Sequence, residues 1–192
     1  MRRLSFDLRG LPPSQMEVQK FVSGDVTYEA LIDSFLASEH FGERMAQYWL
    51  DLVRYADSGG YHSDVTVHIS PYRDYVIKSF NDNLPFNQFT IEQLAGDMLT
   101  GPTPEQKLAT GFHRQAMQAK GNNPRKEEFR IKGIVDRLKT TGRTWLGLSL
   151  ECAECHDHKY DPISQRDYYQ IFAIFNNDGD SVVMMSSSSV TF

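Results

Sequence analysis

Apolar residues recur every three or four positions through most of this chain, which is the spacing of helices that bury one face. The pattern predicts helices that begin near residues 14, 27, 41, 72 and 89, one over 104–118, one of about 20 residues from Ile131, and a last one capped by Ser164 and Asp167. We expect residues 4–13 to be extended, because Pro12 and Pro13 close that segment. No strand alternation is evident, so the expected fold class is mostly α, an irregular multi-helix domain.

Two segments interrupt the helical pattern. Residues 57–70 contain adjacent glycines and small polar residues, which predicts a long glycine-containing loop with a short extended piece at 65–68. The end of the chain is rich in Asp, Gly and Ser. We therefore expect one helical domain over residues 1–177, followed by a tail or a domain boundary over 178–192.

Composition adds two exclusions. The 192 residues carry 20 Lys and Arg against 25 Asp and Glu, a net charge of -5 that offers no basic surface to nucleic acid. The chain contains no run of apolar residues long enough for a membrane span, so we expect none in this segment. With 40% hydrophobic residues, the composition is that of a soluble globular domain.

The two cysteines form the most specific motif. Cys152 and Cys155 lie three positions apart and His156 follows directly, which is the Cys-x-x-Cys-His pattern for covalent attachment of a c-type haem, here between the last two helices. Neighbouring cysteines cannot form the scaffold of a disulfide-rich secreted domain. In the haem interpretation both thiols bond to the porphyrin, and the His156 imidazole binds the iron from one face. His158 then either contacts a haem propionate or carboxylate, or lies at the solvated surface.

Two other chemistries remain open for the same residues. Cys152, Cys155, His156 and His158 are zinc-type ligands within one short stretch, which allows a structural zinc site. Zinc sites usually combine two separated ligand pairs, and adjacent Cys155 and His156 fit poorly on one tetrahedron. A dithiol redox site is a weaker alternative, because such motifs usually start a helix in an α/β fold.

The occupant of the sixth iron position decides between electron transfer and chemistry at an open site. His113 and Met117 are four positions apart, which places both on one face of the predicted 104–118 helix. We therefore expect His113, and after it Met117, as the distal ligand. His62 and His68 in the glycine-containing loop are further candidates.

The wider sequence resembles a known family. The motifs that carry the resemblance are Arg3-Leu4, Asp7-Leu8-Arg9-Gly10-Leu11-Pro12-Pro13, Gly42-Glu43-Arg44, Trp49-Leu50-Asp51, Arg54-Tyr55-Ala56-Asp57-Ser58, Tyr72-Arg73-Asp74, Gln93-Leu94-Ala95-Gly96-Asp97, Ala109-Thr110-Gly111-Phe112-His113-Arg114, and Cys152-Ala153-Glu154-Cys155-His156-Asp157-His158-Lys159-Tyr160-Asp161-Pro162-Ile163. They resemble the planctomycete cytochrome-like domain over nearly all of residues 2–177. The resemblance implies a c-type haem on Cys152, Cys155 and His156 and an electron-transfer or redox-linked role.

The same resemblance implies a setting outside the cytoplasm. Domains of this family typically lie between a cytochrome c-like domain and a C-terminal domain of unknown function in large exported proteins. The expected partner is therefore a redox partner protein or a neighbouring cytochrome domain of the same polypeptide. Residues 1–6 show no signal peptide, so we expect this chain to be an excerpt of a longer precursor, periplasmic or extracellular.

Three functions stay open at this point. The first is a c-type haem domain in electron transfer or a redox-linked role. The second is an enzyme with an open haem or another metal site that acts in extracytoplasmic degradation. The third is a structural zinc-binding or interaction domain.

Overall fold

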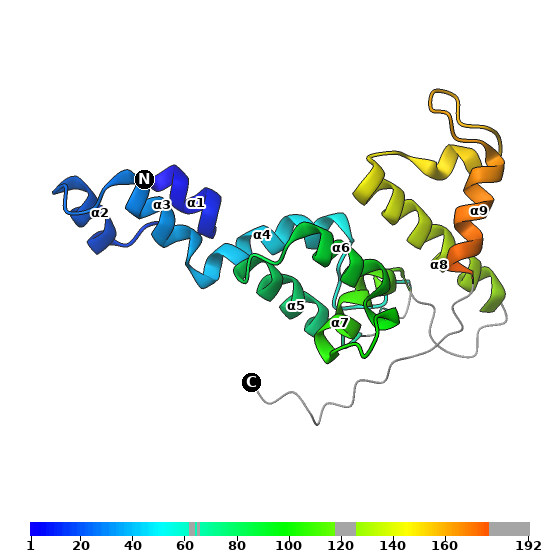
Figure 1. The fold of residues 1–192 in the computed structure, drawn as a ribbon, viewed down its shortest axis with the longest axis horizontal. Coiled ribbons are helices and arrows are strands. Elements are labelled where there is room, and N and C mark those ends of the chain that lie inside the picture. Colours follow the sequence, from blue (N-terminus) through cyan, green and yellow to red (C-terminus); the bar gives the residue numbers. More distant parts are fainter. Residues whose placement is uncertain (62–63, 65, 118–125, 177–192) are drawn as a thin grey trace. The chain divides into compact units, whose positions relative to one another are not determined.

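Helices joined by turns make up most of the protein (Figure 1). The computed structural model describes residues 1–61, 64, 66–117 and 126–176. The prediction of a mostly α fold is confirmed for this part of the chain. No helix within it is both long and apolar enough to cross a membrane.

The chain divides into two compact units. Unit 1 comprises Met1–Pro124 and unit 2 comprises Arg125–Phe192. Each unit has buried side chains of its own and is described separately below. The expected single domain over residues 1–177 stays a prediction.

Unit 1 consists of α-helices and short 3-10 helices that follow one another closely. Its elements are α1 (Arg2–Arg9), α2 (Gln15–Val22), α3 (Tyr28–Leu36), α4 (Glu39–Leu52), α5 (Ser70–Asn81), α6 (Phe86–Ala95), η1 (Gly96–Met98), α7 (Pro104–Ala109) and η2 (Thr110–Arg114). Side-chain oxygens of Ser14, Thr27 and Thr103 accept hydrogen bonds from backbone N–H groups at the starts of α2, α3 and α7. The predicted helix starts near residues 14, 27 and 104 are thus confirmed.

The expectation of an extended segment over residues 4–13 is wrong, because Arg2–Arg9 form α1. Pro12 restrains only the residue before it, and the helix has already ended at Gly10. Gly10 has a φ of 70°, and its N–H donates to the carbonyl of Phe6. The buried Ser5 Oγ then donates to the Leu11 carbonyl at 2.7 Å, which turns the chain back along the helix.

Helices α4 and α5 approach each other at a glycine. A Cβ atom on Gly42 would lie 2.4 Å from the backbone oxygen of Ile77, so only glycine fits there. The Gly42 N–H donates to Asn81 Oδ1 at 2.7 Å. This close contact brings the buried Tyr72 and Val76 of α5 into the interior of unit 1.

Hydrogen bonds link several buried polar side chains of unit 1. Tyr72 Oη accepts from Trp49 Nε1 at 3.0 Å and donates to the buried Gln93 Oε1 at 2.8 Å. Tyr75 Oη donates to Glu92 at 2.7 Å. Burial, followed by the hydrogen bond to Glu92, raises the pKa of Tyr75 above its ordinary range, so the phenol stays protonated.

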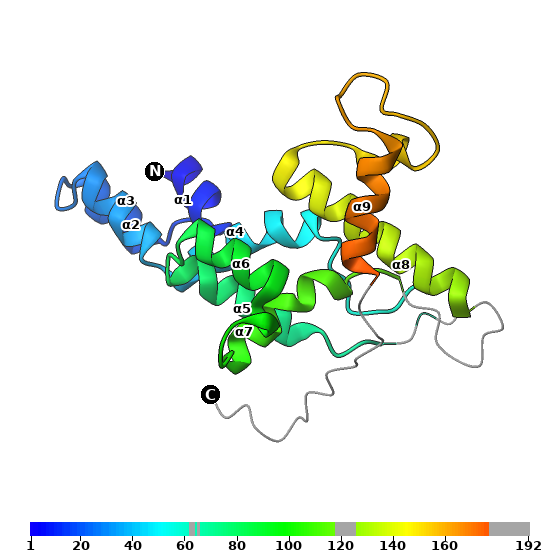
Figure 2. The same ribbon diagram turned by 45° about the vertical axis from the view of Figure 1, so that its right-hand side comes forward.

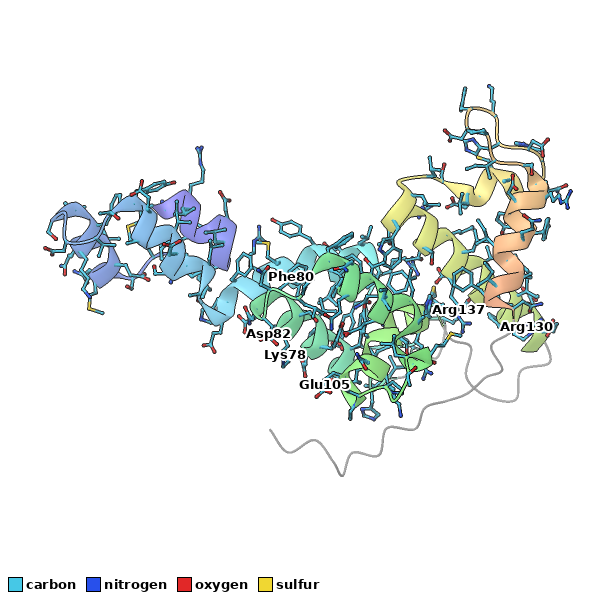
Figure 3. All side chains as sticks on the ribbon, viewed as in Figure 1. Lys78, Phe80, Asp82, Glu105, Arg130 and Arg137 are labelled. Atoms are coloured by element: carbon cyan, nitrogen blue, oxygen red, sulfur yellow. The ribbon has the colours of Figure 1, made fainter. Side chains whose placement is uncertain are left out.

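The exposed side of α5 carries charge pairs instead of apolar contacts. Lys78 of α5 and Asp82, the residue directly after α5, form an ion pair at the surface of unit 1 (Figure 3). This pair raises the pKa of Lys78. A surface pair of this kind contributes little to stability, so the buried face of α5 holds unit 1 together.

Unit 2 is a pair of helices joined by a long irregular connection (Figure 2). Its elements are α8 (Lys126–Thr141), a π-helical turn η3 (Gly142–Leu146), a 3-10 helix η4 (Leu150–Glu154) and α9 (Gln165–Phe175). The predicted long helix is confirmed, since α8 and η3 are continuous. The predicted cap of the last helix is also confirmed, because Ser164 and Asp167 form a capping box.

The core of unit 2 lies between α8, η4 and α9. Its buried residues are Leu138, Leu150, Ala153 and Tyr168, and Ile163 and other partly buried apolar side chains pack against them. At the far end of the helix pair, Arg130 of α8 donates to the side chain of Asn176, which follows α9, at 2.5 Å (Figure 3). The core is small, so each of its buried side chains contributes a large share of the stability of unit 2.

Candidate functional site

The Cys-x-x-Cys-His motif lies on η4 and directly after it. A 3-10 helix has three residues per turn, so residues three apart share a face. Leu150 and Ala153 are both buried, which directs that face into the core of unit 2. Cys152 and Cys155 have the same spacing on a different face, and both are exposed and free. The spacing of the motif therefore places both thiols together on the solvent side.

His156 follows the second cysteine and is also exposed. Its Nδ1 lies 2.7 Å from the backbone oxygen of Asp157. A carbonyl oxygen can only accept, so Nδ1 carries the proton and donates it. In the neutral ring the lone pair is then on Nε2, which is the state required for binding a metal through Nε2.

The segment after His156 is held to the start of α9. Asp157 Oδ1 accepts the backbone N–H of Gln165 at 2.8 Å. The Glu154 carbonyl accepts from Gln165 Nε2 at 3.0 Å and from Tyr169 Oη at 3.2 Å. Both ends of the turn are thereby attached to α9, which is itself packed on the core of unit 2.

His158 stabilises the loop between the motif and α9, which projects beyond the helix ends (Figure 1). Its side chain is only 6% exposed, so it is not a solvated surface residue. Its Nδ1 accepts the backbone N–H of Asp161 at 2.9 Å and that of Tyr160 at 3.3 Å. Its own backbone N–H donates to the Ile163 carbonyl at 2.8 Å. Since Nδ1 accepts from the backbone, it bears no proton toward the Asp161 carboxylate, 3.2 Å away.

These residues fit a covalently attached haem. The two cysteines are free and exposed, and the His156 ring is held in the tautomer that presents Nε2. The fit to zinc is poorer, because His158 Nδ1 is engaged by backbone amides. Within the described ranges, no three His, Cys, Asp or Glu side chains are grouped to hold a metal ion. Zinc stays an alternative prediction.

The candidate distal ligands belong to unit 1. His113 lies on η2, and its Nε2 donates to the Leu94 carbonyl at 3.1 Å. Met117 lies beyond η2 and is exposed, with its side chain against Gly60. Their role as ligands stays a prediction.

The expected helix over residues 104–118 is wrong beyond α7. Thr110 Oγ1 donates to the Lys107 carbonyl at 2.7 Å, and the chain tightens into η2. Gly111 also packs directly on the Tyr72 ring, where a Cβ atom would lie 2.8 Å from Cδ2. His113 and Met117 therefore do not share the face of one helix.

The glycine-containing loop has hydrogen bonds among its own described residues. Ser58 and Thr66 form an isolated antiparallel bridge, and Tyr55 Oη donates to Asp57 Oδ1 at 2.5 Å. Burial and this hydrogen bond raise the pKa of Tyr55 to about 12. His68 is exposed, whereas His62 lies outside the described residues.

Comparison with known families shows to which protein family the chain belongs. A family model described as PSCyt2, a protein of unknown function (DUF1549), matches residues 1–179. The chain belongs to this family. The resemblance to the planctomycete cytochrome-like domain is thereby confirmed, and PSCyt2 membership covers both units. No curated protein and no solved structure shows a significant match.

Sequence reasoning on this PSCyt2 chain missed the link between the motif and α9. Asp157 and Gln165 connect the two. The family resemblance implies that Asp157 belongs to the haem surroundings, but it does not imply the bond to α9, and Gln165 is not a predicted site residue. The Ser164 and Asp167 capping box does mark where α9 begins, and it leaves the Gln165 N–H without a partner inside the box. A helix start whose first N–H has no partner inside the capping box, together with an Asp directly after the Cys-x-x-Cys-His motif, is the signal in the sequence.

Proposed function

We propose that this PSCyt2 chain carries a c-type haem on Cys152, Cys155 and His156, as an electron-transfer or redox-linked domain of a larger exported protein. The geometry of η4 carries the proposal, because it exposes both thiols together and His156 follows them directly. When bound, haem would supply an iron centre that takes up and releases one electron.

Each residue of the turn has a separate role in this proposal. The Cys152 and Cys155 thiols hold the haem covalently, so a deep pocket is not needed to retain it. The hydrogen bond from Nδ1 fixes the orientation of His156 and makes Nε2 more basic. Leu150 and Ala153 attach the turn to the core of unit 2.

The proposed setting follows the expectations from the motif. We place the protein in the periplasm or outside the cell, where haem is attached to such motifs. Its partner is a redox protein or a cytochrome domain of the same polypeptide. The expectation that His113 or Met117 is the distal ligand stays a prediction, since both belong to unit 1 and His113 Nε2 donates to the Leu94 carbonyl.

The test is haem attachment in a host with the machinery for c-type cytochromes. The chain is exported behind a signal peptide, denatured, and examined by haem staining, by mass spectrometry and by the pyridine haemochrome spectrum. We expect a haem that survives denaturation and is lost in a Cys152→Ser, Cys155→Ser double variant. His40→Ala, which removes an exposed histidine paired with Glu43, is the matched control and should retain haem.

Two outcomes would change the conclusion. A colourless protein of unmodified mass would overturn the haem proposal, and bound zinc would then establish the structural alternative. In a loaded protein, a low-spin spectrum unaffected by cyanide supports electron transfer. A high-spin ferric spectrum that shifts with cyanide indicates an open site, as in an enzyme.

A further inference from the structure

Asp157 accepts hydrogen bonds at its backbone oxygen and at its carboxylate. Its backbone oxygen accepts from His156 Nδ1 at 2.7 Å, and its carboxylate accepts from the backbone N–H of Gln165 at 2.8 Å. The carbonyl that orients the imidazole and the carboxylate that binds α9 therefore belong to one residue. The carboxylate holds the Asp157 backbone next to α9, and the N–H of the same peptide group, which belongs to His158, is donated to the Ile163 carbonyl.

The start of α9 is a strong partner for this carboxylate. The first N–H groups of a helix have no partner within the helix, and the helix dipole favours a negative charge there. The capping box uses the N–H groups of Ser164 and Asp167. The N–H of Gln165, the first residue of α9, is then donated to Asp157.

The loop that leaves Asp157 is also restrained. The neighbouring His158 has a buried side chain, and its ring nitrogen and backbone N–H hold the chain through Ile163. Asp157 thus lies between an anchored helix and a closed loop, while the imidazole bonded to its carbonyl is exposed.

We propose that Asp157 is a positioning residue that couples the start of α9 to the orientation and tautomer of His156. The effect on an iron centre rests on the proposed function, but the effect on the His156 ring does not. Loss of the Asp157 carboxylate removes one of the two hydrogen bonds that hold this part of the backbone, and the bond from the His158 N–H to the Ile163 carbonyl remains. The share of His156 with a protonated Nδ1 then falls and, in a loaded protein, His156 binds iron as a less basic ligand.

The first experiment uses the full chain without haem. Ring 15N chemical shifts at alkaline pH distinguish a protonated Nδ1 from a mixture of tautomers. We expect one tautomer for His156 in the native protein and in Asp157→Asn, whose amide oxygen still accepts the Gln165 N–H. We expect a mixture in Asp157→Ala. The matched control Asp161→Ala removes another loop carboxylate and should leave His156 unchanged.

A second pair of variants acts from α9 and serves where Asp157→Ala fails to fold. Gln165→Pro removes the N–H donated to Asp157, and proline is well tolerated at the first position of a helix. Ser164, with a φ of -82° and a ψ of 160°, already has the conformation preferred before proline. Gln165→Ala keeps the N–H and removes the side-chain bond to Glu154. Only Gln165→Pro should give a mixture of His156 tautomers.

The loaded protein provides the second readout. A weaker His156 ligand stabilises ferric iron less, so the midpoint potential should rise in Asp157→Ala and in Gln165→Pro. It should stay near the native value in Asp157→Asn and Gln165→Ala. An unchanged His156 tautomer in both Asp157→Ala and Gln165→Pro would overturn the coupling, even in a fully loaded protein. A chain that never binds haem but shows the tautomer change would refute the proposed function and leave the coupling standing.

Discussion

Leu150 attaches the Cys-x-x-Cys-His turn to the core, and Leu150→Ala should loosen the whole site. The side chain is 2% exposed and contacts the cluster of Leu138, Ala153 and Tyr168. Truncating a buried leucine costs about 3 to 5 kcal/mol, from lost burial and from the cavity left behind. A unit of roughly 70 residues carries on the order of 5 kcal/mol of stability. The substitution should therefore consume most of the stability of unit 2.

Hydrogen exchange of the full chain, followed by mass spectrometry, measures this effect locally. A loss of about 3 kcal/mol corresponds to roughly 100-fold faster exchange in peptides from α8 and α9. Peptides from unit 1 serve as the internal reference. Leu146→Ala is the matched control, because Leu146 is the same residue type at 57% exposure, and it should alter exchange less than about threefold. Equal protection of α8 and α9 in the two variants would refute the assignment of Leu150 as the anchor.

Three further predictions concern unit 1. Gly42→Ala places a methyl group 2.4 Å from a backbone oxygen of α5 and should cost about 3 kcal/mol in chemical denaturation; an unchanged midpoint would contradict the close approach. Tyr72→Phe removes a buried hydroxyl that serves Trp49 and Gln93 and should cost about 2 kcal/mol, whereas Tyr48→Phe, at an exposed tyrosine, should be near neutral. The hydrogen bond from Arg9 lowers the pKa of Glu17 from 4.5 to about 2, so this pair stabilises the fold above pH 4.5 and loses that effect as the pH falls toward 2. Thermal unfolding of the native chain should show about 1 kcal/mol of acid destabilisation that Glu17→Gln lacks, and equal acid sensitivity would refute it.

Local signals predicted the helices well where a cap or a periodic face marked them. Ser14 and Ser164 begin helices in the structure as the capping patterns indicate, because a cap depends on residues within one turn. The same reasoning failed at residues 4–13 and beyond α7. Pro12 restrains only the residue before it, so Arg2–Arg9 can form α1. Beyond α7, Gly111 packs on the Tyr72 ring, a contact between residues distant in sequence.

In the candidate site, too, local sequence predicts some features and distant contacts decide others. The three-residue spacing of Cys152 and Cys155 is enough to place both thiols on one face of a 3-10 turn, and family membership follows from the motifs along the chain. Periodicity alone does not say which face is buried. The packing of Leu150 and Ala153 on α8 and α9 decides that the thiols are exposed, because burial depends on the partner surface.

The sequence by itself therefore determines the chemistry available in this protein: two thiols and an imidazole in one turn of a mostly helical chain. Tertiary structure decides how Asp157, whose carbonyl accepts from that imidazole, is held. The Asp157 carbonyl and carboxylate act together only because the start of α9 lies next to the motif. That proximity results from packing of the unit 2 core, whose residues are distant in sequence and carry no local signal of the contact.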